Sequence, residues 1–146
     1  MRRVHMRITT KGRYALRAVV ALARLSDGSA PVSIKTIGDE EGLSAEFLEQ
    51  IFFRLKKAGI IRSIRGPGGG FVFARPLSSI LLKDIVMASG EGVELAACSG
   101  EGDEAQCDRI DRCAAGKVWR ELSEHIDAYL TGVSLEQILA RDGRAD

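Results

Sequence analysis

The sequence predicts a mainly α-helical protein with one small β-hairpin, in which a winged helix-turn-helix is followed by a long C-terminal helix. Three observations predict this fold class: two short helical segments joined by a tight turn, a glycine-rich hairpin directly after them, and a long amphipathic segment near the end. With 146 residues the chain can bury one core, so one domain with an appendage is expected.

Local capping signals predict the first three helices. Apolar residues recur at helical spacing between the capping pair Thr9 and Thr10 and a turn at 26–28. Ser33 is the expected N-cap of a short helix over 34–41 that ends at a glycine, and Ser44 is the expected N-cap of the third helix. Two helices joined by so short a turn are typical of a helix-turn-helix.

A β-hairpin is expected directly after these helices. Residues 60–64 and 71–73 have strand composition, and the six residues between them contain four glycines and a proline. A hairpin in this position is the wing of a winged helix, in which the second helix of the motif enters the major groove of DNA.

The second half of the sequence predicts two further helical regions with an aperiodic segment between them. A helix is expected from Leu77 to Ala88, and a longer one from Lys117 to Leu130, followed by a short helix that a capping box opens at Ser134. A long amphipathic helix outside the folded domain needs a partner surface, and a second copy of the chain is the simplest partner, so a homodimer is expected.

The charges are divided between the two halves, although the net charge is only +1. Residues 1–75 carry 14 Lys and Arg against 6 Asp and Glu, whereas residues 76–146 carry 7 against 14, so the halves have net charges of +8 and −7. A basic half of this kind is expected of a protein that binds the phosphate backbone, and double-stranded DNA is the expected partner. Solvated charge on an ordinary surface is the alternative.

Several other classes of protein are disfavoured by the sequence. No apolar stretch approaches the roughly 20 residues that a membrane span needs, and the N-terminal residues do not resemble a signal peptide, so a cytoplasmic protein is expected. No nucleophile and base pair, phosphate loop or metal-hydrolase motif is present, which argues against an enzyme. The expected organisation is a winged-helix DNA-binding domain at 1–77, a connecting helix at 78–90, a cysteine-rich sensor loop at 91–116, dimerisation helices at 117–140 and a polar tail at 141–146.

The wing and the third helix supply the candidate DNA-binding residues. Arg65 is expected to enter a narrow minor groove, because such a groove concentrates negative potential. Glu46, Glu49 and Gln50 are expected to contact bases, because glutamate can accept a hydrogen bond from cytosine and glutamine can pair with adenine. Phe47 is equally a core residue or a contact to a thymine methyl group. Arg54 is expected to meet phosphate, as are two cations of the first helix. The complete set of candidates is Lys11, Arg13, Ser44, Glu46, Phe47, Glu49, Gln50, Arg54, Arg65, Gly66, Gly68 and Gly69.

Three cysteines lie in the aperiodic segment, at Cys98, Cys107 and Cys113. Their spacing is not that of a zinc ribbon or of a Cys-x-x-Cys redox motif, and an odd number of thiols in a reducing compartment disfavours disulfides. An iron-sulfur cluster takes cysteine thiolates and would order a loop of this length. The spacing alone leaves metal binding and bare redox thiols equally open.

The sequence resembles the IscR/NsrR (Rrf-two) family of bacterial regulators from Met6 to about Leu139. The resemblance is carried by residues 6–17 (MRITTKGRYALR), 42–50 (GLSAEFLEQ), 64–71 (IRGPGGGF) and 118–122 (VWREL). It implies a dimeric winged-helix transcription regulator in which the three cysteines hold an iron-sulfur cluster that can be lost during aerobic preparation. A 2Fe-2S cluster is favoured, and a 4Fe-4S cluster is the alternative. A cluster-free regulator that responds through its thiols or a partner protein is the alternative.

The resemblance does not extend to the fourth cluster ligand. In the cluster-supply sensors a histidine follows the third cysteine by three residues, and this position is Gly116 here. In the nitric-oxide sensors an acid of the partner's opening helix can complete the site, and that helix here has no Asp, Glu or His. Asp103, Asp108, Asp111 and His5 remain as alternatives, with none preferred.

Overall fold

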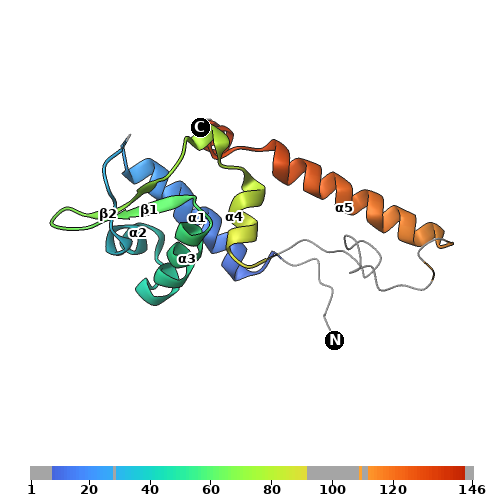
Figure 1. Ribbon diagram of the computed structural model, residues 1–146, viewed down its shortest axis with the longest axis horizontal. Coiled ribbons are helices and arrows are strands. Elements are labelled where there is room, and N and C mark those ends of the chain that lie inside the picture. The colour runs from blue at the N-terminus through green and yellow to red at the C-terminus, as the bar shows by residue number, and fades with distance from the viewer. Residues whose placement is uncertain (1–7, 28, 92–108, 110–111, 144–146) are drawn as a thin grey trace.

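The computed structural model describes residues 8–27, 29–91, 109 and 112–143, and its element order agrees with the predicted fold class. The elements are α1 (Thr10–Leu25), α2 (Ile34–Glu41), α3 (Ala45–Lys57), β1 (Ile61–Ile64), β2 (Gly70–Phe73), the 3-10 turn η1 (Leu77–Ser79), α4 (Leu82–Ala88), α5 (Ala114–Gly132) and α6 (Leu135–Asp142). Figure 1 shows α1 to α4 and the hairpin packed into one body, here called the head, with the hairpin at one end and α5 extending away from the other.

The predicted caps of the first helices are confirmed. The Ser33 hydroxyl accepts a hydrogen bond from Thr36 N at 3.1 Å, and the Ser44 hydroxyl accepts one from Phe47 N at 3.2 Å. Gly42 ends α2 in the left-handed conformation, with φ of 67°. Each cap satisfies backbone groups that have no partner within the helix, so the turn between α2 and α3 is specified locally.

The core lies where α1, α2 and α3 meet under the hairpin. Its fully buried side chains include Val19, Leu22, Ile37, Leu48 and Phe52. The Phe52 ring stacks on Phe71 of β2 with 5.0 Å between the ring centroids. This contact joins the hairpin to the helical core.

The hairpin is also held by a backbone bridge that the sequence did not predict. The strands pair in antiparallel register from Ile61 with Phe73 to Ile64 with Gly70. Val32, before α2, forms an isolated bridge with Phe71, through hydrogen bonds of 3.1 Å and 2.8 Å. A Cβ on Gly70 would lie 2.4 Å from the Val32 backbone, so only glycine permits this approach.

The helix expected from Leu77 to Ala88 is divided in two. Leu77–Ser79 forms a 3-10 turn, Ile80 and Leu81 are extended, and α4 begins only at Leu82. The Asp84 carboxylate accepts a hydrogen bond from Leu81 N at 2.9 Å and caps the helix there. The extended residues pair with the segment between α5 and α6, since Leu81 and Ser134 form an isolated bridge.

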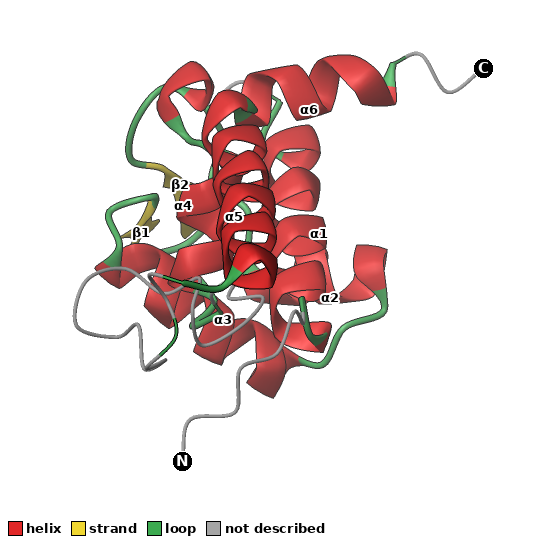
Figure 2. Ribbon diagram, turned by 90° about the vertical axis from the view of Figure 1, so that its right-hand side faces the viewer, coloured by secondary structure: helices red, strands yellow, loops and turns green. Residues whose placement is uncertain are grey.

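Helix α5 begins at Ala114, three residues before the expected start, because Cys113 acts as its N-cap. The predicted capping box of α6 is confirmed, with Ser134 and Gln137 exchanging hydrogen bonds. Figure 2 shows α6 above α1, and an ion pair between Arg24 and Asp142 joins the ends of these helices. Within the described ranges, no helix is both long and apolar enough to cross a membrane.

The close approach at Gly70 gives a prediction for stability. A Gly70→Ala substitution is expected to lower the free energy of unfolding by about 1–3 kcal/mol, because the new methyl group must displace the Val32 backbone. Thermal denaturation followed by circular dichroism measures the loss. Gly132→Ala is the matched control, since a Cβ there meets no heavy atom within 4 Å. Equal melting temperatures for the two variants would contradict the steric argument.

Candidate nucleic-acid interface

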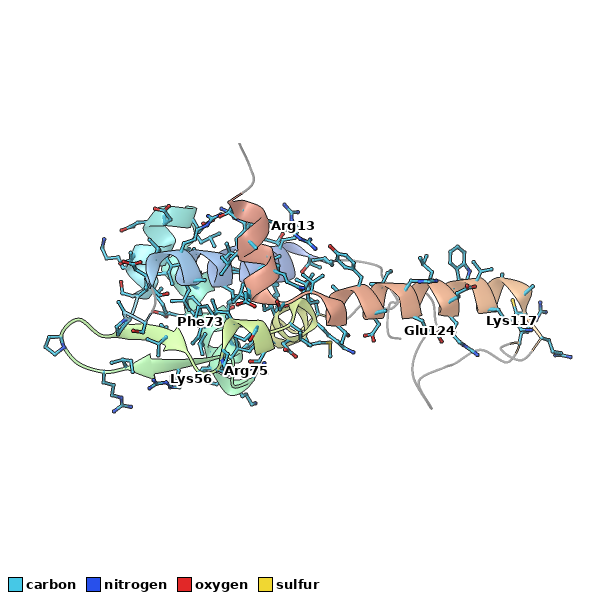
Figure 3. All side chains as sticks on the ribbon, turned by 90° about the horizontal axis from the view of Figure 1, so that it is seen from above. Arg13, Lys56, Phe73, Arg75, Lys117 and Glu124 are labelled. Carbon is cyan, nitrogen blue, oxygen red and sulfur yellow. The ribbon has the colours of Figure 1, made fainter. Side chains whose placement is uncertain are left out.

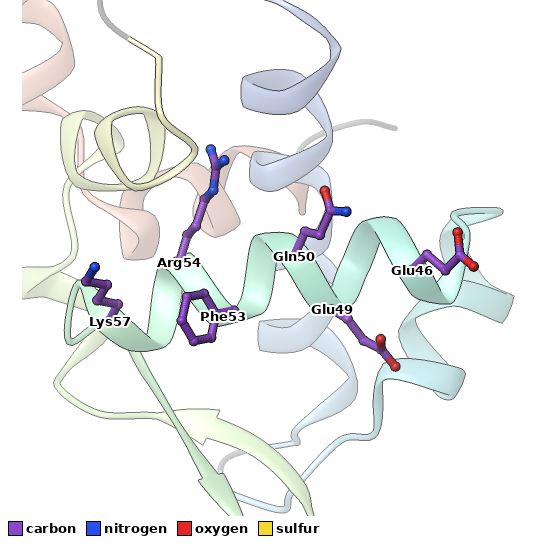
Figure 4. Close-up of a pocket in the computed structure, with 6 residues that line it drawn as sticks. All are labelled: Glu46, Glu49, Gln50, Phe53, Arg54 and Lys57. Atoms are coloured by element: carbon purple, nitrogen blue, oxygen red, sulfur yellow. The ribbon is translucent and has the colours of Figure 1, made fainter.

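Helix α3 has one buried face and one exposed face. Leu48, Ile51, Phe52 and Leu55 are buried against the core. The opposite side is here called the reading face and consists of Glu46, Glu49, Gln50, Phe53 and Lys57. Together with Arg54 these residues line a pocket on the surface of the helix, shown in Figure 4. The structure therefore brings together the predicted base-contacting residues Glu46, Glu49 and Gln50 on one accessible surface.

Ser44 and Phe47 have structural roles that compete with base contacts. The Ser44 hydroxyl is used as the cap of α3. Phe47 is half-buried and packs edge to face on Tyr14 of α1, with 5.5 Å between the ring centroids. Tyr14 in turn lies under the guanidinium of Arg17, at 5.2 Å. Of the two interpretations given to Phe47 from the sequence, this packing supports the core residue.

Arg54 points away from the reading face. Its Nη1 donates a hydrogen bond of 2.7 Å to the carbonyl oxygen of Ser89, which caps the C-terminus of α4. Figure 4 shows the side chain directed toward that helix. Carbonyls at a helix C-terminus carry partial negative charge, and a guanidinium suits them well. In this structure one guanidinium nitrogen of the exposed Arg54 is therefore bound within the protein, and its contact with phosphate stays a prediction.

The tip of the hairpin presents its cation to solvent. Arg65, Gly66 and Gly68 are exposed, and Gly69 is half-buried. Gly66 and Gly68 have φ of 102° and 72°, which side chains rarely adopt, and a Cβ on Gly69 would lie 2.3 Å from the carbonyl oxygen of Ile64. The glycines are therefore required by the turn itself, and the turn leaves Arg65 exposed at its base.

Other cations lie close to α3 and the hairpin. Lys56 Nζ donates a hydrogen bond of 3.1 Å to Ser63 of β1, and Arg62 is exposed on the same strand. The exposed acids of α2 are partly neutralised, since Asp39 pairs with Lys35 at 2.9 Å and raises the pKa of that lysine through a side-chain hydrogen bond. Positive charge is therefore concentrated at the end of α3 and along the wing.

The predicted contacts of α1 lie at its first turn. Lys11 and Arg13 are both exposed there. Figure 3 shows Arg13 on the head, whereas Lys117 lies at the far end of α5. The two α1 cations thus belong to the head that carries the reading face.

The residues that lead into the cysteine-rich segment contact two helices of the head. This junction (residues 89–91) includes Ser89, which accepts the bond from Arg54 of α3. It also includes Glu91, whose Oε2 accepts a hydrogen bond of 2.9 Å from Thr9 N at the start of α1. A carboxylate at a helix N-terminus satisfies a free N–H group and complements its partial positive charge. The junction is therefore tied to both α1 and α3.

Of the three cysteines, Cys113 lies within the described residues, and Cys98 and Cys107 lie outside them. The Cys113 thiol is half-buried, and its Sγ accepts a hydrogen bond from Gly116 N at 3.4 Å. Gly116, which holds the family's histidine position, is buried in the first turn of α5. No group of three or more metal-ligating side chains gathers within the part of the chain that the structure describes.

Helix α5 carries an exposed apolar stripe. Val118, Trp119, Leu122 and Tyr129 are all exposed, and Trp119 retains 45% of its surface. In a single chain, large apolar side chains gathered on a helix that leaves the body mark an interaction surface.

Sequence reasoning missed two of the residues that define this region. Phe53 was left without a role, although its spacing from Glu46, Glu49 and Gln50 places it on their face of the helix. Glu91 was assigned only to the sensor loop, and no local pattern signals a contact with Thr9, which is 82 residues away.

The arrangement of α2, α3 and the β1-β2 hairpin, with an exposed reading face and a cationic wing, defines a winged-helix DNA-binding protein. Residues 8–141 match the Rrf2 (Rrf-two) family, described as an iron-dependent transcriptional regulator. The chain therefore belongs to the Rrf2 family, which confirms the predicted fold, the resemblance and a role in transcription regulation, not in catalysis.

Individual relatives extend over nearly the whole chain. The transcriptional regulator IscR of Photorhabdus laumondii is 39% identical over 135 residues, which cover 92% of this chain and 79% of that protein. The structure of T. potens IscR has a TM-score of 0.75 at 31% identity and covers 96% of this chain and 90% of that one. The structure of CymR, the global cysteine regulator of B. subtilis, has a TM-score of 0.73 at 29% identity and covers 94% of this chain and 98% of that one.

The exposed position of Arg65 gives a prediction for DNA binding. Arg65→Ala is expected to weaken binding to double-stranded DNA roughly tenfold, because a cation is removed from the phosphate-rich groove. The slope of the logarithm of the binding constant against the logarithm of the salt concentration should become shallower by about one. Fluorescence anisotropy over a range of salt concentrations measures both effects. Lys117→Ala removes one cation from the far end of α5 and should leave binding unchanged. An Arg65→Ala titration that matches the wild type would exclude the wing from the interface.

Proposed function

We propose that this chain is a homodimeric transcription regulator whose binding to promoters is switched by an iron-sulfur cluster held by Cys98, Cys107 and Cys113. The observation that carries the proposal is the junction (residues 89–91), because the cysteine-rich segment begins where the chain contacts both α1 and α3. A change in that segment can therefore reach α3 through the bond between Arg54 and Ser89, and α1 through the bond between Thr9 and Glu91. The similarity to IscR from T. potens and Photorhabdus laumondii supports the same function.

The local chemistry of Cys113 fits a cluster ligand. Its sulfur is accessible and accepts a backbone hydrogen bond, and hydrogen bonds to ligand sulfurs are one way in which proteins tune a cluster. A bound cluster would supply a centre that reacts with nitric oxide, oxygen or thiols. Gly116 can support Cys113 through its N–H but offers no side chain as a ligand, so the three cysteines are the proposed set. His125 lies about 18 Å along α5 from Cys113, at 1.5 Å per residue, and is too distant to complete it.

The homodimer is supported by the exposed stripe of α5. A second copy of the chain can cover Val118, Trp119 and Leu122 with the same stripe, since a two-fold interface pairs identical surfaces. Two heads would then be carried at a fixed separation, as binding to two half-sites requires.

A second candidate function is a cluster-free regulator of the same fold that responds through its thiols or a partner protein. The structural similarity to CymR, the global cysteine regulator of B. subtilis, favours this alternative. The two candidates differ in whether iron is bound.

Anaerobic purification distinguishes them. The wild type is expected to be brown, with visible absorbance and bound iron that are lost in both Cys107→Ala and Cys113→Ala, because each change removes a ligand. His125→Ala is the control and should keep the colour. A colourless, iron-free wild type that still binds DNA fully would favour the cluster-free regulator.

The dimer has its own test. Leu122→Asp is expected to yield monomers in analytical ultracentrifugation, because it places a charge in the centre of the proposed apolar interface. Glu124→Ala, on the same helix, should remain dimeric. If Leu122→Asp sediments like the wild type, the α5 stripe is not the interface.

A further inference from the structure

Phe53 is an aromatic side chain that the fold leaves uncovered. It retains 68% of its surface, whereas Phe52 is fully buried. The remaining phenylalanines of the chain are partly buried and packed against the core, at Phe47, Phe71 and Phe73. Exposing a ring of this size in water is unfavourable, so its burial is available as binding free energy for a ligand.

The position of Phe53 places it at the centre of the reading face. Glu49 lies one helical turn before it and Lys57 one turn after it, and Gln50 lies on the adjacent ridge. Figure 4 shows the ring among these polar side chains. A ring on a helix has only two side-chain torsions to fix, so its burial costs little conformational entropy.

The mixture of groups on this face indicates its occupant. The floor of the major groove offers hydrogen-bond acceptors, hydrogen-bond donors and one apolar group, the C5-methyl group of thymine. The reading face offers carboxylates that accept, an ammonium group that donates, an amide that does both, and one apolar ring. The cations Lys56 and Arg62 beside this face match the phosphates at the edges of a groove.

We infer that Phe53 is a specificity-determining residue whose ring contacts the C5-methyl group of a thymine in the major groove. The inference rests on the proposed function, in that α3 must enter the groove. Phe53 takes the role that the sequence left open for Phe47, because Phe47 is packed against Tyr14 while Phe53 is free to be covered.

The test begins with selection of duplexes from a random library by the full-length protein. In the wild-type motif each thymine is then replaced by deoxyuridine, which lacks only the C5-methyl group. One replacement in one half-site is expected to weaken wild-type binding about fourfold, the effect of losing one buried methyl group. Phe53→Ala should bind that thymine and deoxyuridine equally well and should select no preference for thymine at that position.

Met87→Ala is the matched control, because Met87 is an apolar side chain on α4 that retains 56% of its surface and lies outside the reading face. It should show the wild-type response to deoxyuridine. An equal response to deoxyuridine in the wild type and in Phe53→Ala overturns the inference. A Phe53→Ala variant that changes its oligomeric state but keeps its DNA selectivity also overturns it, because the ring would then make a protein contact. A wild type that binds no duplex contradicts the proposed function as well, whereas one that binds without sensitivity to any thymine methyl group contradicts only the role of Phe53.

Discussion

The burial of Phe52 beneath the hairpin determines the orientation of the DNA-binding surface. The ring is fully buried and stacks on Phe71, so one apolar contact fixes α3 relative to β2. Because side chains project from a helix at fixed angular spacing, burying Phe52 and Leu55 turns Glu49 and Phe53 outward. The orientation of the reading face therefore depends on hydrophobic packing, which salt does not screen, whereas its affinity for DNA depends on charges, which salt does screen.

Backbone bridges between distant segments position the hairpin and α5. Val32 pairs with Phe71, and the residues around Leu81 pair with those around Ser134, through Leu82 N to Val133 O and Leu135 N to Ile80 O, each at 2.8 Å. A hydrogen bond of this kind contributes only about 1 kcal/mol net, so the second bridge sets the point at which α5 leaves the head without covering its length. The apolar stripe on α5 consequently remains exposed in the single chain.

The sequence predicted those features that depend on neighbouring residues. Ser33 and Ser44 each cap a helix through a backbone N–H group three residues later, and the glycines of the wing serve their own turn, so local patterns were sufficient. The division of the helix over 77–88 was missed because it depends on pairing with Ser134, more than 50 residues later. The candidate site was predicted in the same way: the residue types on α3 were identified, but the engagement of Arg54 by Ser89 required the tertiary structure.

The contacts of the junction have the strength that the proposed coupling between the cysteine-rich segment and DNA binding requires. The charged side chains of Arg54 and Glu91 each make one hydrogen bond to a backbone group at a helix terminus, at 2.7 Å and 2.9 Å. Such bonds contribute about 1.5–3 kcal/mol each, and exposure to solvent favours the lower end of that range. Coupling free energies between sites in allosteric proteins are about 1–3 kcal/mol, so the loss of a single junction bond is sufficient in magnitude. Both bonds lie outside the apolar core, so the proposed switch requires no change in the packing of Phe52 and its neighbours, which hold α3 in place.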